Sequence, residues 1–446
     1  MVEVMSNILR RSFLGSAGAA IVYTLVPSSQ AQRRKYGAND NIRLGFIGVG
    51  VQGSGLLDEF KVMPGVTPTV ACDLYDGYLQ HAREAVNGKL ETTKDYRTVL
   101  DRKDIDAVVI ATPDHLHFRM VLDALDAGKH VYIEKPLTWS IEEGTHIIRA
   151  EKNSGKLLQV GSQAKSSALT AKAKQLIKEG ALGKVNMIRM SNNRNSAEGA
   201  WRYPIPPNAS PSPIDWPRFL GHYPQRPFDP EVFFRWRCWW EYSGGVATDL
   251  FVHLLTHMHE VMDVEAPVSA VSQGGLYKWK DGRTVPDVMN SIFEYEEGFV
   301  IDMYVNLCNS RSGTPTTIMG DKGSMVFQGR RLVIYPEVEA GEAQSYGSRA
   351  WPRDLRNEYL RKHGVKVDAS GEQFPEREMP KEKEVTVEAG PSHTGHFILS
   401  LREGKQSVEN ATEGHFAAAG AHLANMAFRN NCKASWDRVS GAVSLS

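Results

Sequence analysis

The chain has 446 residues, enough for two domains, because single hydrophobic cores rarely grow beyond roughly 250 to 300 residues. Its 52 basic and 52 acidic side chains balance, so nothing in the charge favours nucleic acid or an anionic membrane surface as a partner. Hydrophobic residues make up 41% and charged residues 23% of the chain, as in an ordinary soluble protein.

The first 31 residues have the pattern of an export signal. Arg10 and Arg11 precede a short, weakly apolar run that ends in small residues around Ala31, which is typical of a twin-arginine (Tat) signal peptide. The alternative is a chance arginine pair before a membrane anchor, but this run is too short and too polar to span about 30 Å of hydrocarbon. We therefore predict a cleaved signal over residues 1–31, a linker over 32–40, and export to the periplasm, with no later membrane span.

Residues 41–163 alternate between apolar strands and helices. Strands without polar alternation, separated by helices, indicate a parallel sheet that is covered on both faces. We predict a doubly wound Rossmann domain, which binds ligands at the carboxyl ends of its strands. The strand-like runs are 42–50, 66–73, 106–113, 130–136 and 156–163, and the clearest helical stretches are 54–63, 117–129 and 141–155.

A dinucleotide fingerprint follows the first strand. Gly48, Gly50 and Gly53 have the spacing that lets backbone approach a pyrophosphate at a helix N-terminus. Asp73 ends the second strand twenty residues after Gly53, where a carboxylate accepts hydrogen bonds from a ribose diol and repels a 2′-phosphate. NAD is therefore favoured over NADP. The predicted cofactor-binding residues are Gly48, Gly50, Val51, Gln52, Gly53, Asp73, Thr112, Pro113, His117, Glu134, Lys135 and Gln163.

Two further motifs end strands at the same sheet edge. In "ATPDHLHF", His115 and His117 follow the strand in a loop, and His115 is a candidate substrate contact. In "IEKP", Pro136 ends the next strand and favours an extended conformation for Lys135, which directs the ammonium group out of the sheet edge. Lys135 alone would be a solvated surface charge, but this edge is where the nicotinamide is expected.

Residues 164–446 form the second predicted domain, which binds substrate. A helix over 167–182 is followed by alternating strands, which indicate a mostly antiparallel sheet. These strands cover 184–192, 269–279, 289–307 and 323–336; 345–388 is predicted to be a polar surface excursion, and helices return at 396–408 and 413–430.

An aromatic, proline-rich insert covers residues 201–245, and its length indicates function rather than a simple connection. Its tryptophans either stack on sugar faces or form core and subunit contacts. The weaker candidates for substrate contact in this insert are Arg235, Trp236, Arg237 and Tyr242.

The stretch "GGVATDLFVHLLTHMHEVM" carries a second set of polar residues. Asp249, His253 and His257 are four residues apart, so on a helix they share a face. A carboxylate, an imidazole and a lysine beside a nicotinamide are suited to alcohol oxidation, in which one group takes the hydroxyl proton. Metal binding by these histidines and His259 is the rival interpretation, but no H-E-x-x-H pattern is present. Four scattered cysteines, Cys72, Cys238, Cys308 and Cys432, indicate buried free thiols and no zinc site.

In combination, "GVGVQG", "ATPDHLH", "EKP" and "GG...D...H" resemble the Gfo/Idh/MocA oxidoreductases over nearly all of the mature chain. The resemblance implies that Lys135, Asp249 and His253 are catalytic. It also implies a large C-terminal sheet that is often used for oligomer contacts, and therefore a homodimer or homotetramer. The chain departs from many relatives at Thr256, where they have an acid.

Three functions follow as hypotheses. The leading one is an exported, NAD-dependent oxidoreductase with a tightly bound cofactor, acting on a secondary hydroxyl of a sugar or sugar derivative. In this hypothesis Lys135 and His253 handle the hydroxyl proton, and Asp249 orients His253. The alternative is redox-neutral glycoside hydrolysis through transient oxidation at C3, as in NAD-dependent alpha-N-acetylgalactosaminidases similar to this family. The third is a non-catalytic carbohydrate-binding protein on the same frame.

Overall fold

A computed structural model describes residues 37, 40–311, 313, 315–338, 346–368, 371–374 and 380–446. The predicted signal over 1–31 lies outside the described residues, as does most of the linker. Within that part of the chain, no helix combines the length and the apolar character needed to cross a bilayer.

The first domain is built on a six-stranded parallel sheet with the order β3-β2-β1-β4-β5-β6. Its central strands are buried on both faces, which explains their continuous apolar sequence. This confirms the predicted doubly wound arrangement. The strands are β1 Ile42–Ile47, β2 Val66–Cys72, β3 Glu91–Thr93, β4 Ala107–Ile110, β5 His130–Glu134 and β6 Leu158–Gly161.

Helices cover both faces of this sheet, and one of them comes from the far end of the chain. On one face, Phe397 of α11 (His393–Glu403) packs its ring against Phe60 and Tyr132. The opposite face packs Ile133 and Ile147 in a separate apolar cluster. The other helices are α1 Val51–Lys61, α2 Asp76–Ala85, α3 Tyr96–Leu100, α4 Asp114–Asp126 and α5 Ile141–Ser154.

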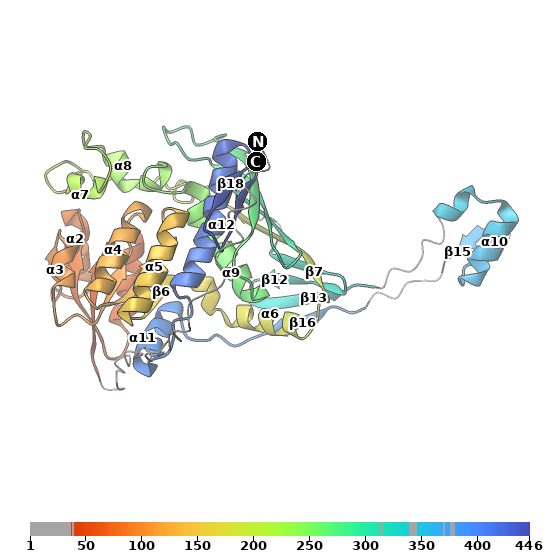
Figure 1. The fold of residues 1–446 in the computed structure, drawn as a ribbon, viewed down its shortest axis with the longest axis horizontal. Helices are drawn as coiled ribbons and strands as arrows, with labels where there is room; N and C mark the ends of the chain where they lie inside the picture. The colour runs from red at the N-terminus through yellow and green to blue at the C-terminus, as the bar shows by residue number, and fades with distance from the viewer. Residues whose placement is uncertain are drawn as a thin grey trace, which may run out of the picture. The chain divides into compact units, whose positions relative to one another are not determined.

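The second domain is built on a ten-stranded sheet with the order β16-β13-β12-β11-β7-β10-β9-β8-β17-β18. Every pairing is antiparallel except that of β7 with β10, so the predicted mostly antiparallel sheet is confirmed. Figure 1 shows α6 (Ala168–Lys178), α9 (Val252–Met262) and α12 (Ala411–Asn430) beside this sheet. The strands are β7 Val185–Asn193, β8 Ser269–Gly275, β9 Val288–Glu294, β10 Val300–Asn306, β11 Thr317–Gly320, β12 Gly323–Gln328, β13 Arg331–Pro336, β16 Lys383–Thr386, β17 Ala434–Trp436 and β18 Val443–Leu445.

The stretch 345–388 contains more regular structure than its sequence suggests. It holds α10 (Arg353–Lys362), the hairpin of β14 (Lys366–Asp368) and β15 (Gly371–Gln373), and the edge strand β16. α10 is mostly polar and Leu360 is its one buried residue, so it lacks the apolar periodicity that identifies a helix from sequence. Strands of three or four residues are too short to show alternation.

The aromatic insert is mostly irregular, as predicted, with two short helices, α7 (Trp216–Leu220) and α8 (Pro230–Phe234). It is anchored to the first domain by backbone hydrogen bonds. Asp215 donates to the Leu74 carbonyl at 2.8 Å, and Asp76 donates to the Pro213 carbonyl at 3.0 Å. Figure 1 shows α7 and α8 along one end of the Rossmann domain, where the strands carry their carboxyl ends.

Candidate active site

A cavity of about 790 Å³ lies at the carboxyl ends of β1, β2 and β4, within the usual size range of small-molecule sites. Seven of the twelve predicted cofactor residues line it. They are Gly48, Gly50, Val51, Gln52, Asp73, Thr112 and Pro113. We call this cavity the cofactor cleft.

The geometry of the glycine-rich turn requires glycine at two of the three fingerprint positions. Gly48 has φ +87°, and a Cβ there would lie 2.7 Å from the Ala111 carbonyl. A Cβ at Gly53 would lie 2.0 Å from the Gly48 carbonyl oxygen. Gly53 therefore does not line the cleft but lets α1 approach the turn, which directs the helix N-terminus at the space where a pyrophosphate fits.

Asp73 reaches the cleft from the end of β2. Its Oδ2 accepts a hydrogen bond from the Val49 amide at 2.8 Å, and its Oδ1 accepts one from the Tyr75 amide at 3.0 Å. Burial raises the pKa of Asp73 to about 6, against the lowering effect of these two amides. Each carboxylate oxygen keeps a second lone pair, so the group can still accept from a ribose hydroxyl.

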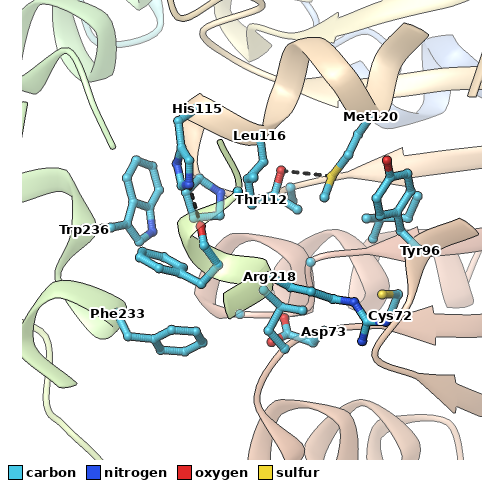
Figure 2. A pocket seen from close by; sticks show the side chains of 18 of the residues that line it. Cys72, Asp73, Tyr96, Thr112, His115, Leu116, Met120, Arg218, Phe233 and Trp236 are labelled. Atoms are coloured by element: carbon cyan, nitrogen blue, oxygen red, sulfur yellow. Dashed lines mark hydrogen bonds between the residues drawn. The ribbon is translucent and has the colours of Figure 1, made fainter. Parts of the chain in front are cut away.

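The aromatic insert forms the opposite wall of the cofactor cleft. Figure 2 shows Phe233 and Trp236 on one side of the cavity and Cys72, Tyr96 and Met120 on the other. The sequence left open whether the insert binds sugar or forms core. The structure places its aromatic side chains in a shared core with Tyr75 of the first domain and on the cofactor cleft.

A second, smaller cavity of about 200 Å³ holds the predicted catalytic residues, and we call it the catalytic pocket. Gln52, Thr112, Trp236 and Arg237 line both cavities, so the two adjoin. A ligand in the catalytic pocket would therefore contact a cofactor in the cleft. The pocket is lined by Gln52, Ala111, Thr112, Asp114, Glu134, Lys135, Gln163, Arg194, Trp201, Tyr203, Trp236, Arg237, Asp249 and His253.

Asp249 is the centre of the polar contacts in this pocket. Lys135 Nζ donates to its Oδ1 at 2.7 Å, and Arg237 Nε donates to the same oxygen at 3.0 Å. Trp201 Nε1 donates to Oδ2 at 3.1 Å. Burial acts to raise the pKa of Asp249, but the charges of Lys135 and Arg237 outweigh it and hold that pKa well below its usual range.

Local structure positions these groups. Lys135 directly follows β5, and the Lys135–Pro136 peptide bond is cis. Asp249 lies in a π-helical turn over Ala247–Phe251 that leads into α9, a local widening often found at functional sites. His253, in the first turn of α9, also lines the pocket. Burial and then the Lys135 charge lower the pKa of His253 to about 3, so the imidazole is neutral at ordinary pH.

Glu134 connects the cofactor-binding and catalytic residues. Its Oε1 accepts hydrogen bonds from Gln52 Nε2 at 2.9 Å and from Gln163 Nε2 at 3.3 Å. Burial raises the pKa of Glu134. The three predicted residues therefore lie together in the pocket, and Gln52 lines the cleft as well.

Two predicted histidines lie away from both cavities. The ring nitrogens of His117 contact the Pro136 carbonyl at 2.7 Å and the Thr112 carbonyl at 2.9 Å. The side chain therefore links the segments that follow β4 and β5. α4 begins at Asp114, which puts His115 and His117 on a helix and not in a loop as expected. His257 packs against the Phe327 ring, because two steps of four residues rotate it by about 80° around the helix from Asp249.

Of three other candidate residues, one lines the cofactor cleft and two line neither cavity. His115 lines the cofactor cleft, with Nε2 hydrogen-bonded to the Phe219 carbonyl at 2.7 Å (Figure 2). Tyr242 is buried among aromatic rings. Arg235 donates to the Tyr203 carbonyl at 2.9 Å and pairs with Glu231, so it turns away from the catalytic pocket.

Several site residues were not predicted. Arg194 and Tyr203 come from the irregular segment after β7, where no motif marks them. Asp114 accepts from Thr248 Oγ1 at 3.3 Å, and burial raises its pKa to about 7. All four cysteines are free thiols, with Cys72 and Cys238 buried and Cys308 and Cys432 half-buried. Among the described residues, no cluster of histidine, cysteine or acidic side chains has the arrangement of a metal site.

Comparison with known proteins agrees with this architecture. Among solved structures, the chain is similar to levoglucosan dehydrogenase in complex with NADH and levoglucosan, with TM-score 0.64 and 18% identity over 89% of this chain and 99% of that chain. An NAD-binding protein from Listeria innocua gives TM-score 0.62 with 18% identity over 89% of this chain and 99% of that one. At these identities the likeness shows the fold.

The curated relatives match a smaller part of this chain. The alpha-N-acetylgalactosaminidase of Shewanella oneidensis is 33% identical over 178 residues, or 33% of this chain and 39% of that protein. A glycosyl hydrolase family 109 protein of Shewanella baltica is 32% identical with the same coverage. The match thus spans well under half the length of these relatives.

Two family models together cover most of the chain. Residues 42–162 match the NAD-binding Rossmann fold of an oxidoreductase family, and residues 174–431 match the C-terminal alpha/beta domain of the same family. With the cofactor cleft and the catalytic pocket in the places that these two domains create, the chain belongs to the Gfo/Idh/MocA oxidoreductase family.

Proposed function

We propose that this protein is an NAD-dependent oxidoreductase that acts on a secondary hydroxyl of a sugar or sugar derivative. The observation that carries the proposal is the contact of Lys135 with Asp249, beside His253, in a pocket that adjoins the cofactor cleft. These are the groups that alcohol oxidation requires next to a nicotinamide.

The residues present fit a dinucleotide. Gly48 and Gly53 keep the turn free of side chains, and Asp73 faces the ribose end with a carboxylate that would repel a 2′-phosphate. This favours NAD over NADP. When bound, NAD supplies the hydride acceptor. The aromatic wall of Phe233 and Trp236 closes the cleft from the other side and would slow release of the cofactor.

The side chains of the pocket divide the proton chemistry between them. The neutral imidazole of His253 accepts the hydroxyl proton, while the Lys135 ammonium donates a hydrogen bond to the same oxygen. The expected arrangement had Asp249 orienting His253. The carboxylate instead binds Lys135, Arg237 and Trp201, so its proposed role is to fix the position and charge of the lysine.

The decisive test compares Lys135→Met with the unaltered protein after both are shown to be folded and to contain NAD. We expect hydride transfer to a substrate found by a sugar panel to fall by roughly 10²- to 10⁴-fold, the usual contribution of a positioned proton-transfer group. Lys172→Met, on α6 and outside both cavities, serves as the control. Full turnover of Lys135→Met would contradict the assignment.

A second function is supported by the relatives named above, one of which is an alpha-N-acetylgalactosaminidase. In this scheme, hydride leaves C3 for NAD and the resulting ketone acidifies the C2 proton. Removal of that proton expels the aglycone from C1, water adds at C1, and the hydride returns to C3. Aryl glycosides incubated without added NAD separate the two: aglycone release with no net redox change supports hydrolysis, and accumulation of a keto sugar supports the oxidoreductase.

A non-catalytic carbohydrate-binding role is the third possibility. It is disfavoured by the intact contacts around Asp249. Denaturing the purified protein and finding no released NAD would support it.

Location and assembly belong to the same proposal. The twin-arginine pattern supports export to the periplasm by a route that carries folded proteins, with the cofactor inserted before export. The open face of the ten-stranded sheet carries Val271, Ile292 and Tyr335, which are 41%, 46% and 39% exposed, and this face supports a homodimer or homotetramer. Fractionation of cells and sedimentation of the purified protein test the two points.

A further inference from the structure

The catalytic pocket contains an arginine that has no carboxylate partner. Arg194 follows β7 directly, its amide donates to the Asn306 carbonyl at 2.9 Å, and its Nε donates to Asn192 Oδ1 at 3.1 Å. Among the described residues, no acidic side chain forms an ion pair with it. The guanidinium is half-buried, lines the pocket, and lies near enough to His253 to lower the pKa of that imidazole.

The other charges of the pocket do not neutralise it. Lys135 and Arg237 share the one carboxylate of Asp249, both through the same oxygen. Glu134 and Asp114 also line the pocket, but neither forms an ion pair with Arg194, and burial raises the pKa of both carboxyl groups, that of Asp114 to about 7. A partly buried cation without a counter-charge is unfavourable, and an oxidised nicotinamide ring would add a further positive charge.

We propose that the substrate is an acidic sugar whose carboxylate is bound by Arg194 while its reacting hydroxyl faces Lys135 and His253. A guanidinium matches a carboxylate with two parallel hydrogen bonds, which a neutral sugar cannot replace. The cavity of about 200 Å³ restricts the occupant to a small molecule. The inference rests on the proposed function, which it refines by naming hexuronates as the substrate class.

The aromatic side chains of the pocket are consistent with a sugar at this position. Trp201, Tyr203 and Trp236 line the same cavity as Arg194. Aromatic faces pack against the apolar C–H surface of a sugar ring, while the guanidinium fixes its acidic end. The pocket therefore distinguishes the two ends of its ligand, one by charge and one by the proton-transfer groups.

The test is equilibrium binding to the full, NAD-loaded protein. Isothermal titration compares D-glucuronate with D-glucose and D-galacturonate with D-galactose, pairs that differ only in the carboxylate. We expect a uronate to bind at least ten-fold more tightly than its neutral partner, with the difference shrinking as salt is added. Arg194→Met should abolish the preference, and Arg194→Lys should restore part of it.

Arg202→Met is the matched control. Arg202 lies close in sequence but sits over the Trp279 ring and pairs with Asp281, outside the pocket, so this variant should keep the preference. Equal binding within each pair, binding of neither uronate, or a preference that survives Arg194→Met would each overturn the inference. Failure of the proposed function is separate: it would appear as absent NAD or as turnover that is indifferent to Lys135, whatever the uronates do.

Discussion

Asp249 accepts hydrogen bonds from three side chains that come from different parts of the chain: Lys135 after β5, Trp201 from the insert and Arg237 from the segment before the π-helical turn. Such a carboxylate has little freedom to move. Trp201 itself has φ +61° and is buried, a left-handed conformation that is unfavourable for a tryptophan and is typical of residues held in place for function.

Trp201→Phe tests whether this contact matters. The change keeps an aromatic side chain, although a smaller one, and removes the donor to Asp249 Oδ2. We expect the free energy of unfolding to fall by about 1.5–3 kcal/mol, as for other hydrogen bonds to charged groups, together with slower turnover. Trp279→Phe removes an indole hydrogen bond to the Leu307 carbonyl outside the pocket. Denaturant unfolding and steady-state assays on both variants check this, and equal turnover in the two would contradict it.

Gly53→Ala tests the close approach of α1 to the glycine turn. Its Cβ would lie 2.0 Å from the Gly48 carbonyl oxygen, so the turn must shift and the purified variant should contain little NAD. Gly55→Ala, two residues along the same helix, meets nothing within 4 Å and should be stabilised by about 1 kcal/mol through helix propensity. Cofactor released on denaturation is the measurement, and a fully loaded Gly53→Ala protein would be the contrary result.

Sequence motifs identify some residues of the catalytic pocket but not those that irregular segments bring to it. Lys135, Asp249 and His253 meet in one pocket because strand ends and a helix start fix them. Arg194 and Trp201 reach the same pocket through the irregular path after β7, which no periodicity describes. His257 shows the converse: its spacing suggested a shared face, and helix rotation moved it to Phe327.

At the scale of elements, the insert acts as a wall of the cofactor cleft held by aromatic contacts. Phe234 of α8 packs edge-on against Tyr75 at 5.3 Å and Tyr78 at 6.0 Å between ring centroids. Sequence indicated an ordered aromatic loop but not its location, because the partners of these rings lie more than a hundred residues earlier in the chain. Five strands of the Rossmann sheet were predictable because they are largely apolar runs, whereas the short polar edge strand β3 was missed.

Phe234→Ala should loosen this wall. We expect bound NAD to dissociate at least ten-fold faster, with a loss of stability of about 3–5 kcal/mol typical of a buried phenylalanine. Phe397→Ala is the control, since Phe397 is also buried, packs against Phe60 and Tyr132, and lines neither cavity. Stopped-flow displacement of NAD separates the effects, and equal dissociation rates in the two variants would argue against a retaining role.

At the scale of the whole molecule, a buried carboxylate lies where the two domains meet. Glu409 precedes α12 and has no exposed surface; its carbonyl accepts from the Val160 amide at 3.0 Å. Burial raises its pKa from 4.5 to about 8, although the Lys165 charge and the hydroxyls of Ser162 and Thr256 act to lower it.

The raised pKa of Glu409 predicts how the free energy of unfolding depends on pH. The folded state holds this proton up to about pH 8, whereas the unfolded chain releases it near pH 4.5, so the stability that the proton provides is lost as pH rises between these values. Glu409→Gln should flatten that decline, and the exposed Glu358→Gln on α10 should not. Urea unfolding between pH 5 and 8.5 measures the slopes; an unchanged slope in Glu409→Gln would contradict the prediction.

The bridge between Tyr75 and Ile214 has a consequence for the order in which the protein assembles. The two residues are 139 positions apart, so this contact forms only after the insert has been synthesised and the intervening chain has closed a long loop. During synthesis, the cleft stays open on one side until the insert reaches Tyr75. Enclosure of the cofactor is therefore a late step of folding.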